Sequence, residues 1–124
     1  MHLIPVAIAT LLTTASAIAV IKPAAGDTVH CNQPWQVCWT AVNTDPPQFC
    51  LYLTNFREFP PQIVDLLSRT PITTDGGGCY RSWGACPVFA EMKFASSSPY
   101  RVRAASCSDS NTIYAESGDF TLLP

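Results

Sequence analysis

The six cysteines are the residues of this 124-residue sequence whose type and spacing point most clearly to chemistry. They are Cys31, Cys38, Cys50, Cys79, Cys86 and Cys107. On an oxidising, secretory route such cysteines pair as disulfides, each adding typically about 2–4 kcal/mol to a small domain. The sequence contains no Cys-x-x-Cys, so we expect neither a zinc site nor any other bound metal or cofactor.

Side chains that could catalyse a reaction are few. Once the amino-terminal segment discussed below is removed, His30 is the remaining histidine. A Ser-His-Asp or Cys-His arrangement needs this histidine beside a nucleophile, and nothing in the sequence places one there. The nine acidic residues leave a two-carboxylate glycosidase open as the alternative. Five aspartates, however, lie in turn-like contexts where turn hydrogen bonding is their ordinary role. We therefore expect a protein that is not an enzyme.

Aromatic side chains outside the expected core favour a binding role. They lie on outward-facing strand positions or in the loop 56–61 and could stack on sugar rings or contact a partner protein. The candidate surface consists of Tyr52, Phe56, Phe59, Arg81 and Trp83. The alternative is that these rings cover a second, small apolar cluster.

The first 17 residues have the features of a secretory signal peptide. No charged residue occurs from Leu3 to Ala19, and the small residues at Ala15, Ala17 and Ala19 match the small-x-small cleavage pattern. A membrane anchor would need about 20 apolar residues, and threonines interrupt this run. We expect a signal peptide over 1–17, with cleavage as late as residue 19, and a single secreted domain over 18–124.

The charge balance excludes two classes of partner. Seven basic and nine acidic side chains give a net charge of −2. Nucleic-acid binding usually needs a basic stripe, and membrane-surface binding a polybasic tail, and the sequence has neither. No polar spacer and hydrophobic tail follow Phe120, so we expect no lipid anchor.

An apolar-polar alternation with a period of two predicts strands. In the segments 35–40, 49–54 and 100–105, alternate residues face a core, and Arg101 and Arg103 are expected on a solvated face. Further strands are expected at 18–22, 28–30, 62–67 and 79–83, a flexible connection at 70–78, and a second hairpin strand from Thr112 through Leu122. About seven short strands separated by eleven prolines and six glycines predict an all-β, antiparallel, immunoglobulin/fibronectin-III-like sandwich stapled by disulfides.

Four segments, in order, also resemble a known family. They are Pro23–Val29, Val37–Thr40, Phe49–Asn55 and Pro99–Leu122. They look like the extracellular domain of the fungal cell-wall-synthesis (killer-toxin-resistance, β-1,6-glucan assembly) and Ser/Thr-rich GPI-anchored membrane protein family. The resemblance implies a non-catalytic extracellular module associated with the cell wall or its β-glucan. The missing anchor and the dense cysteines favour the alternative, a small secreted effector that binds a host extracellular protein or surface glycan.

Strand register restricts the disulfide pairing. Opposed residues of an antiparallel pair have a constant sum of positions, and the sum is 117 both for Cys31 with Cys86 and for Cys38 with Cys79. This favours the bridges 31–86 and 38–79. Cys50 and Cys107 remain, on strands expected to neighbour each other in the second sheet, and we expect them to form the third bridge, 50–107. The competing arrangement has local bridges 31–38 and 79–86.

Overall fold

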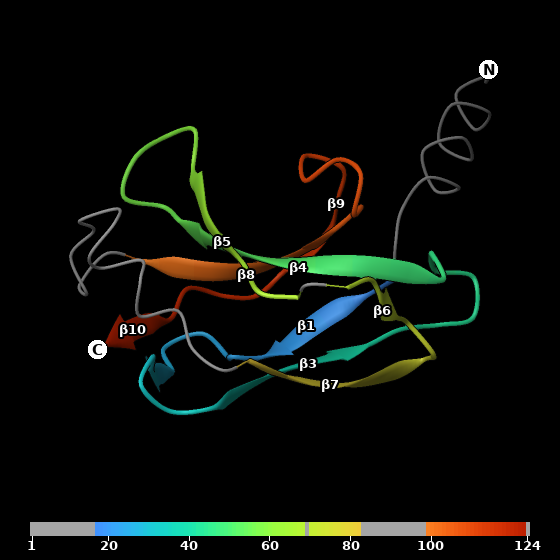
Figure 1. The fold of residues 1–124 in the computed structure, drawn as a ribbon, viewed down its shortest axis with the longest axis horizontal. Coiled ribbons are helices and arrows are strands. Elements are labelled where there is room, and N and C mark those ends of the chain that lie inside the picture. Colours follow the sequence, from blue (N-terminus) through green and yellow to red (C-terminus); the bar gives the residue numbers. More distant parts are fainter. Residues whose placement is uncertain (1–16, 69, 83–98, 124) are drawn as a thin grey trace, which may run out of the picture.

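The computed structural model describes residues 17–68, 70–82 and 99–123, and these ranges contain strands, turns and loops but no helix (Figure 1). The strands are β1 (Ala19–Lys22), β2 (Thr28–His30), β3 (Trp35–Thr40), β4 (Gln48–Asn55), β5 (Gln62–Leu66), β6 (Ile72–Thr73), β7 (Gly77–Ser82), β8 (Tyr100–Ala105), β9 (Ile113–Glu116) and β10 (Thr121–Leu123). No helix within these ranges is long and apolar enough to cross a membrane. The predicted signal peptide falls almost wholly on residues 1–16, which lie outside the described residues.

Two antiparallel sheets face each other across a shared core (Figure 1). One has the order β1-β3-β7, and the other has the order β5-β4-β8-β9, with β6 added beside β4. A short parallel pair, β2 with β10, lies beside them. The predicted immunoglobulin/fibronectin-type sandwich is confirmed, although the described residues form ten strands where about seven were expected.

The core lies between β3 on one sheet and β4 and β8 on the other. Each strand contributes its alternate side chains, as the period-two pattern predicted. These are Trp35, Val37 and Trp39 from β3, Phe49, Leu51 and Leu53 from β4, and Tyr100, Val102 and Ala104 from β8, all buried. Trp39 packs edge-on against Phe49 at 5.1 Å between ring centroids, and its indole N–H donates to the Thr74 carbonyl at 3.0 Å. Each large side chain buried in this way stabilises the fold by roughly 1.5–3 kcal/mol.

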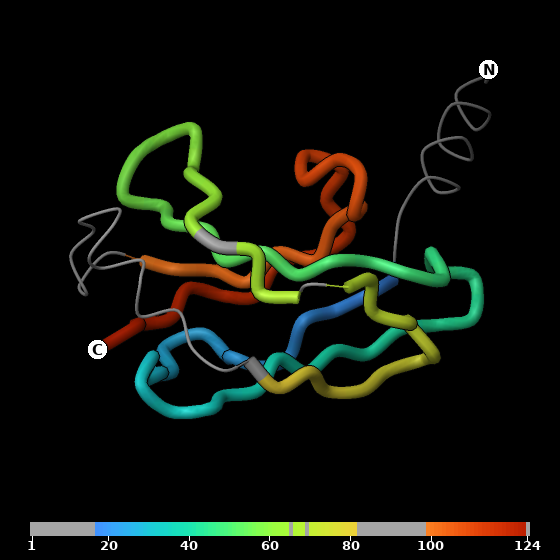
Figure 2. Tube along the Cα trace, viewed as in Figure 1, coloured from blue at the N-terminus to red at the C-terminus, as the bar shows by residue number. Residues whose placement is uncertain are grey.

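The second strand of the closing hairpin is shorter than predicted. It ends at Glu116. Phe120 then forms an isolated antiparallel bridge with Tyr100 of β8, and Thr121 lies opposite Thr28 of β2 in a parallel pair. In Figure 2 the red end of this segment lies near the light-blue stretch that contains β2. The pairing changes at Ser117, whose hydroxyl takes the place of a backbone acceptor for the Val102 amide at 2.9 Å. The prediction of one strand through Leu122 was therefore wrong.

The expected flexible connection at 70–78 is also more ordered than predicted. Residues 72–73 form β6 against the start of β4, and β7 begins at Gly77, opposite Thr40. Gly77 has a φ of 140°, and a Cβ there would lie 3.1 Å from the Trp39 carbonyl oxygen. Thr74 anchors the turn, because its hydroxyl donates to the Pro46 carbonyl at 2.6 Å.

One disulfide joins two neighbouring strands, β3 and β7, of the three-stranded sheet. Cys38 and Cys79 are directly opposed in the β3–β7 register, with their Cα atoms 4.0 Å apart. This bridge excludes the local alternative, in which Cys38 pairs with Cys31. Cys31 is itself disulfide-bonded, and its predicted partner, Cys86, lies outside the described residues.

Candidate binding surfaces

A charged cluster crosses the outer face of the β5-β4-β8-β9 sheet. Its buried member is Arg103, whose residue is only 4% exposed. The guanidinium lies 3.3 Å from a Glu116 carboxylate oxygen and donates to the Ser110 carbonyl at 3.2 Å. Arg103 was expected on a solvated face, and that prediction was wrong. The turn after β8 folds back over this row of the sheet, and Tyr52 stands directly beside Arg103 on β4.

Arg101 is the more exposed arginine of the cluster. Its Nε lies 2.5 Å from an Asp119 carboxylate oxygen, and its Nη1 lies 3.5 Å from Glu116. The hydrogen bond with Asp119 is the main reason that the guanidinium pKa is raised above its ordinary value. The central carbon of the Arg101 guanidinium lies 4.1 Å from the centroid of the Phe56 ring, which is a cation–π contact. Arg101 is thus held between acids on one side and an aromatic ring on the other.

The segment 56–61, which we call the aromatic loop, carries two phenylalanines in contact. The rings of Phe56 and Phe59 lie 6.0 Å apart at 76°. The loop is tied at its base, where the Phe56 amide donates to the Pro99 carbonyl and the Arg57 amide donates to the Asn55 side chain, both at 2.9 Å. Phe59 is 82% exposed. The loop therefore presents an aromatic ring to solvent from an ordered support.

Tyr52 does not extend this aromatic surface. It is 9% exposed, and its hydroxyl donates to the Ser106 carbonyl at 3.0 Å. It packs with Cys50 and Ala105 in a small second cluster. A disulfide joins Cys50 of this cluster to Cys107, and the Cα atoms of the two cysteines are 5.0 Å apart. For Tyr52 the alternative noted from the sequence, burial in a second apolar cluster, is the one that holds.

Exposed aliphatic side chains flank the charged cluster on the same outer face. We call Ile63, Leu66 and Ile113 the aliphatic rim; they are 39%, 48% and 46% exposed. The register places Leu66 beside Tyr52 on β4 and Ile113 beside Ala105 on β8. The sequence did not predict this rim, because Ile63 and Leu66 share a face only through the register shift in the β4–β5 pair.

The structure therefore divides the predicted aromatic surface. Phe56 and Phe59 lie together on the aromatic loop, whereas Tyr52 is buried below the outer face of the same sheet. Arg81 lies on β7 in the other sheet, and Trp83 lies outside the described residues.

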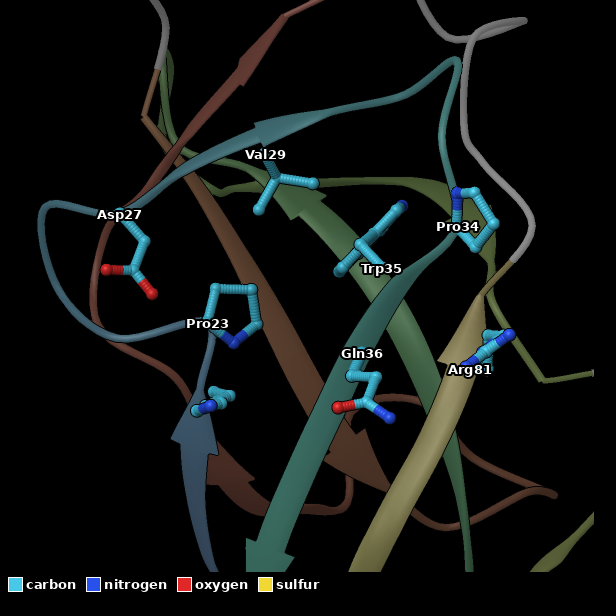
Figure 3. A pocket seen from close by; sticks show the side chains of 8 residues that line it. Pro23, Asp27, Val29, Pro34, Trp35, Gln36 and Arg81 are labelled. Atoms are coloured by element: carbon cyan, nitrogen blue, oxygen red, sulfur yellow. The ribbon is translucent and has the colours of Figure 1, made fainter.

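An open cavity of about 600 Å³ lies beside β2 and the ends of β1 and β3, and we call it the β3 cavity (Figure 3). It is lined by Lys22, Pro23, Asp27, Val29, Pro34, Trp35, Gln36 and Arg81. One lining residue, Trp35, is 8% exposed, and its indole N–H is buried without an acceptor among the described residues. Within the described ranges, no three His, Cys, Asp or Glu side chains are grouped so as to hold a metal ion.

Comparisons with known proteins give limited matches. No family model matches the chain. An uncharacterized protein of Schizosaccharomyces pombe is 42% identical over 50 residues, which are 40% of this chain and 14% of that protein. The chain thus matches only a small part of a longer relative. Among solved structures, fibronectin(III)-like modules of Clostridium thermocellum CbhA align over 86% of this chain and 94% of theirs, at 15% identity and a TM-score of 0.42.

Proposed function

We propose that this chain is a non-catalytic extracellular module of the fungal cell surface that contacts wall β-glucan through the aromatic loop. The observation that carries the proposal is Phe59, a residue that is 82% exposed while its ring contacts that of Phe56. An exposed large apolar ring gains free energy when a ligand covers it, and the C–H face of a pyranose ring fits a flat aromatic surface. The resemblance to the fungal wall-assembly family is what suggests β-glucan as the ligand.

The contacts that hold Phe56 and Arg101 in place also favour binding at the aromatic loop. Arg101 is fixed by Asp119 and Glu116 before any ligand arrives, and it fixes Phe56 in turn. A side chain that is already ordered loses less conformational entropy on binding, which typically costs about 0.5–1.5 kcal/mol for each immobilised side chain. The guanidinium of Arg101, about one-third exposed, also offers hydrogen-bond donors to sugar hydroxyls next to the ring.

The test is a pull-down of the disulfide-intact secreted chain with insoluble β-glucan, chitin and cellulose. We expect retention on β-glucan, and at least about tenfold weaker retention of Phe59→Ala, equal to roughly 1.4 kcal/mol. Ile113→Ala is the matched control, because it removes an exposed apolar side chain at a distance from the loop. Equal retention of the Phe59→Ala and Ile113→Ala proteins would contradict a role for the loop.

The aliphatic rim favours a second candidate, a secreted effector that binds a host extracellular protein. Branched aliphatic side chains pack well against protein side chains and poorly against sugar hydroxyls, and clustered exposed apolar residues mark interaction sites. Leu66→Asp would then abolish partner binding while leaving any glucan retention intact. Recovery of the protein in culture fluid or a host compartment supports this candidate, and retention in the wall after detergent extraction supports the first.

A further inference from the structure

We propose that the β3 cavity is a second binding site, separate from the aromatic loop, and that it takes the carboxylate or phosphate of a small acidic ligand such as a uronic acid or a sugar phosphate. The cavity volume of about 600 Å³ falls within the range of about 300–1,000 Å³ typical of small-molecule sites.

Three polar side chains stand on one face of successive strands at this cavity. Gln36 on β3 lies directly opposite Arg81 on β7, and Lys22 on β1 lies opposite Cys38, two residues from Gln36. All three therefore project from the same face of the β1-β3-β7 sheet. Neighbouring strands are about 4.7–4.9 Å apart, so the backbones of β1 and β7, on either side of β3, are roughly 10 Å apart. Lys22 and Arg81 therefore lie on either side of the Gln36 amide. Figure 3 shows Gln36 and Arg81 side by side.

These groups are not committed to other contacts in the part of the chain that the structure describes. Lys22, Gln36 and Arg81 are exposed and make no side-chain hydrogen bond or ion pair there. The acid in the lining, Asp27, accepts a hydrogen bond from the Ala24 amide at 2.8 Å, which directs its carboxylate toward its own turn. The cavity thus has two cations and an amide with unused donors.

The chemistry of these donors selects the ligand. An arginine fork binds a carboxylate or phosphate with two parallel hydrogen bonds, and a lysine adds a compact positive charge. The wall is otherwise apolar and stiff, because Pro23, Pro34 and Val29 line it. A neutral sugar would leave both cations without a partner.

Titration calorimetry of the intact secreted chain tests the site with four probes: glucuronate, mannose 6-phosphate, inorganic phosphate and glucose. We expect one or more of the anions to bind and glucose not to bind. Glucuronate and the two phosphates together show whether carboxylate or phosphate is preferred. Arg81→Gln should weaken the binding about tenfold or more, and Lys22→Gln by a similar factor. Arg57→Gln removes the same charge from an exposed arginine on the aromatic loop, away from this cavity, and should leave the affinity unchanged.

Because both substituted side chains are exposed, neither change should unfold the protein, and an unchanged thermal midpoint checks this. Three results would each overturn the proposal. They are no binding of any anion, equal binding of glucose, and an equal loss in the Arg57→Gln protein. The Phe59→Ala protein should bind the anions normally, so failure at this site is distinguishable from failure of the proposed glucan contact.

Discussion

The buried ion pair of Arg103 and Glu116 provides a quantitative test of how the outer face of the larger sheet is organised. Glu116→Ala leaves the Arg103 guanidinium, 5% exposed, with the Ser110 carbonyl as its remaining described acceptor. Breaking a buried pair in this way typically costs about 3–5 kcal/mol. The Glu116 side chain is 23% exposed, so we expect a smaller loss of about 2–3 kcal/mol. For a domain of this size that lowers the melting temperature by roughly 10 °C or more.

Arg103→Met should cost less than about 1 kcal/mol, because it removes the charge and fills the site with an apolar chain of similar length. Glu116→Ala should then add little in that background. The measurement is urea-induced unfolding at pH 7 with disulfides intact, followed by tryptophan fluorescence. Glu58→Ala, in the exposed pair with Arg57, is the control and should change stability by less than about 0.5 kcal/mol. Additive effects of the Arg103 and Glu116 changes would refute the coupling.

Three further predictions concern the frame that supports the binding surfaces. Cys107→Ser removes the bridge to Cys50, which spans 57 residues, and should lower the unfolding free energy by about 4 kcal/mol; a midpoint unchanged in urea would contradict this. Gly118→Ala would place a Cβ 2.7 Å from the Ala25 Cβ and should lower the unfolding free energy by roughly 1–3 kcal/mol. The Gly118→Ala/Ala25→Gly double variant should recover part of that stability, and no recovery would contradict a role for this contact. Burial raises the pKa of the Tyr100 phenol, so its stabilising contribution is complete below the unfolded value of about 10 and is lost as pH rises through the folded value. Unfolding measured from pH 9 to 11.5 should show that loss in the wild type and a flatter profile in Tyr100→Phe.

The period-two pattern predicted the inward face of each long strand but not the state of the outward face. Trp39 and Phe49 lie where the alternation put them. Tyr52 and Arg103 were expected outward and are outward, yet both are buried. Alternation assigns a side chain to a face, whereas the turn that covers that face comes from another part of the chain. The local pattern therefore could not predict that side chains on the outward face are buried.

The binding surfaces could be predicted only in part for the same reason. Phe56 and Phe59 were identified because they lie in one short loop, and their contact is local. Arg81 was identified without its surroundings, because Lys22 and Gln36 meet it only through the strand order β1-β3-β7. β10 pairs in parallel with β2 over three residues, and so short a pairing leaves no periodic signal in the sequence.

The most direct test of the central proposal is to map a soluble β-glucan oligosaccharide on the ¹⁵N-labelled chain by amide chemical-shift changes. We expect the changes to centre on the aromatic loop and on Arg101, and to disappear in Phe59→Ala. Amides of the β3 cavity should not move, because the ligand carries no charge. Changes confined to Ile63, Leu66 and their neighbours, or no changes at saturating oligosaccharide, would contradict the account of this chain as a glucan-binding module.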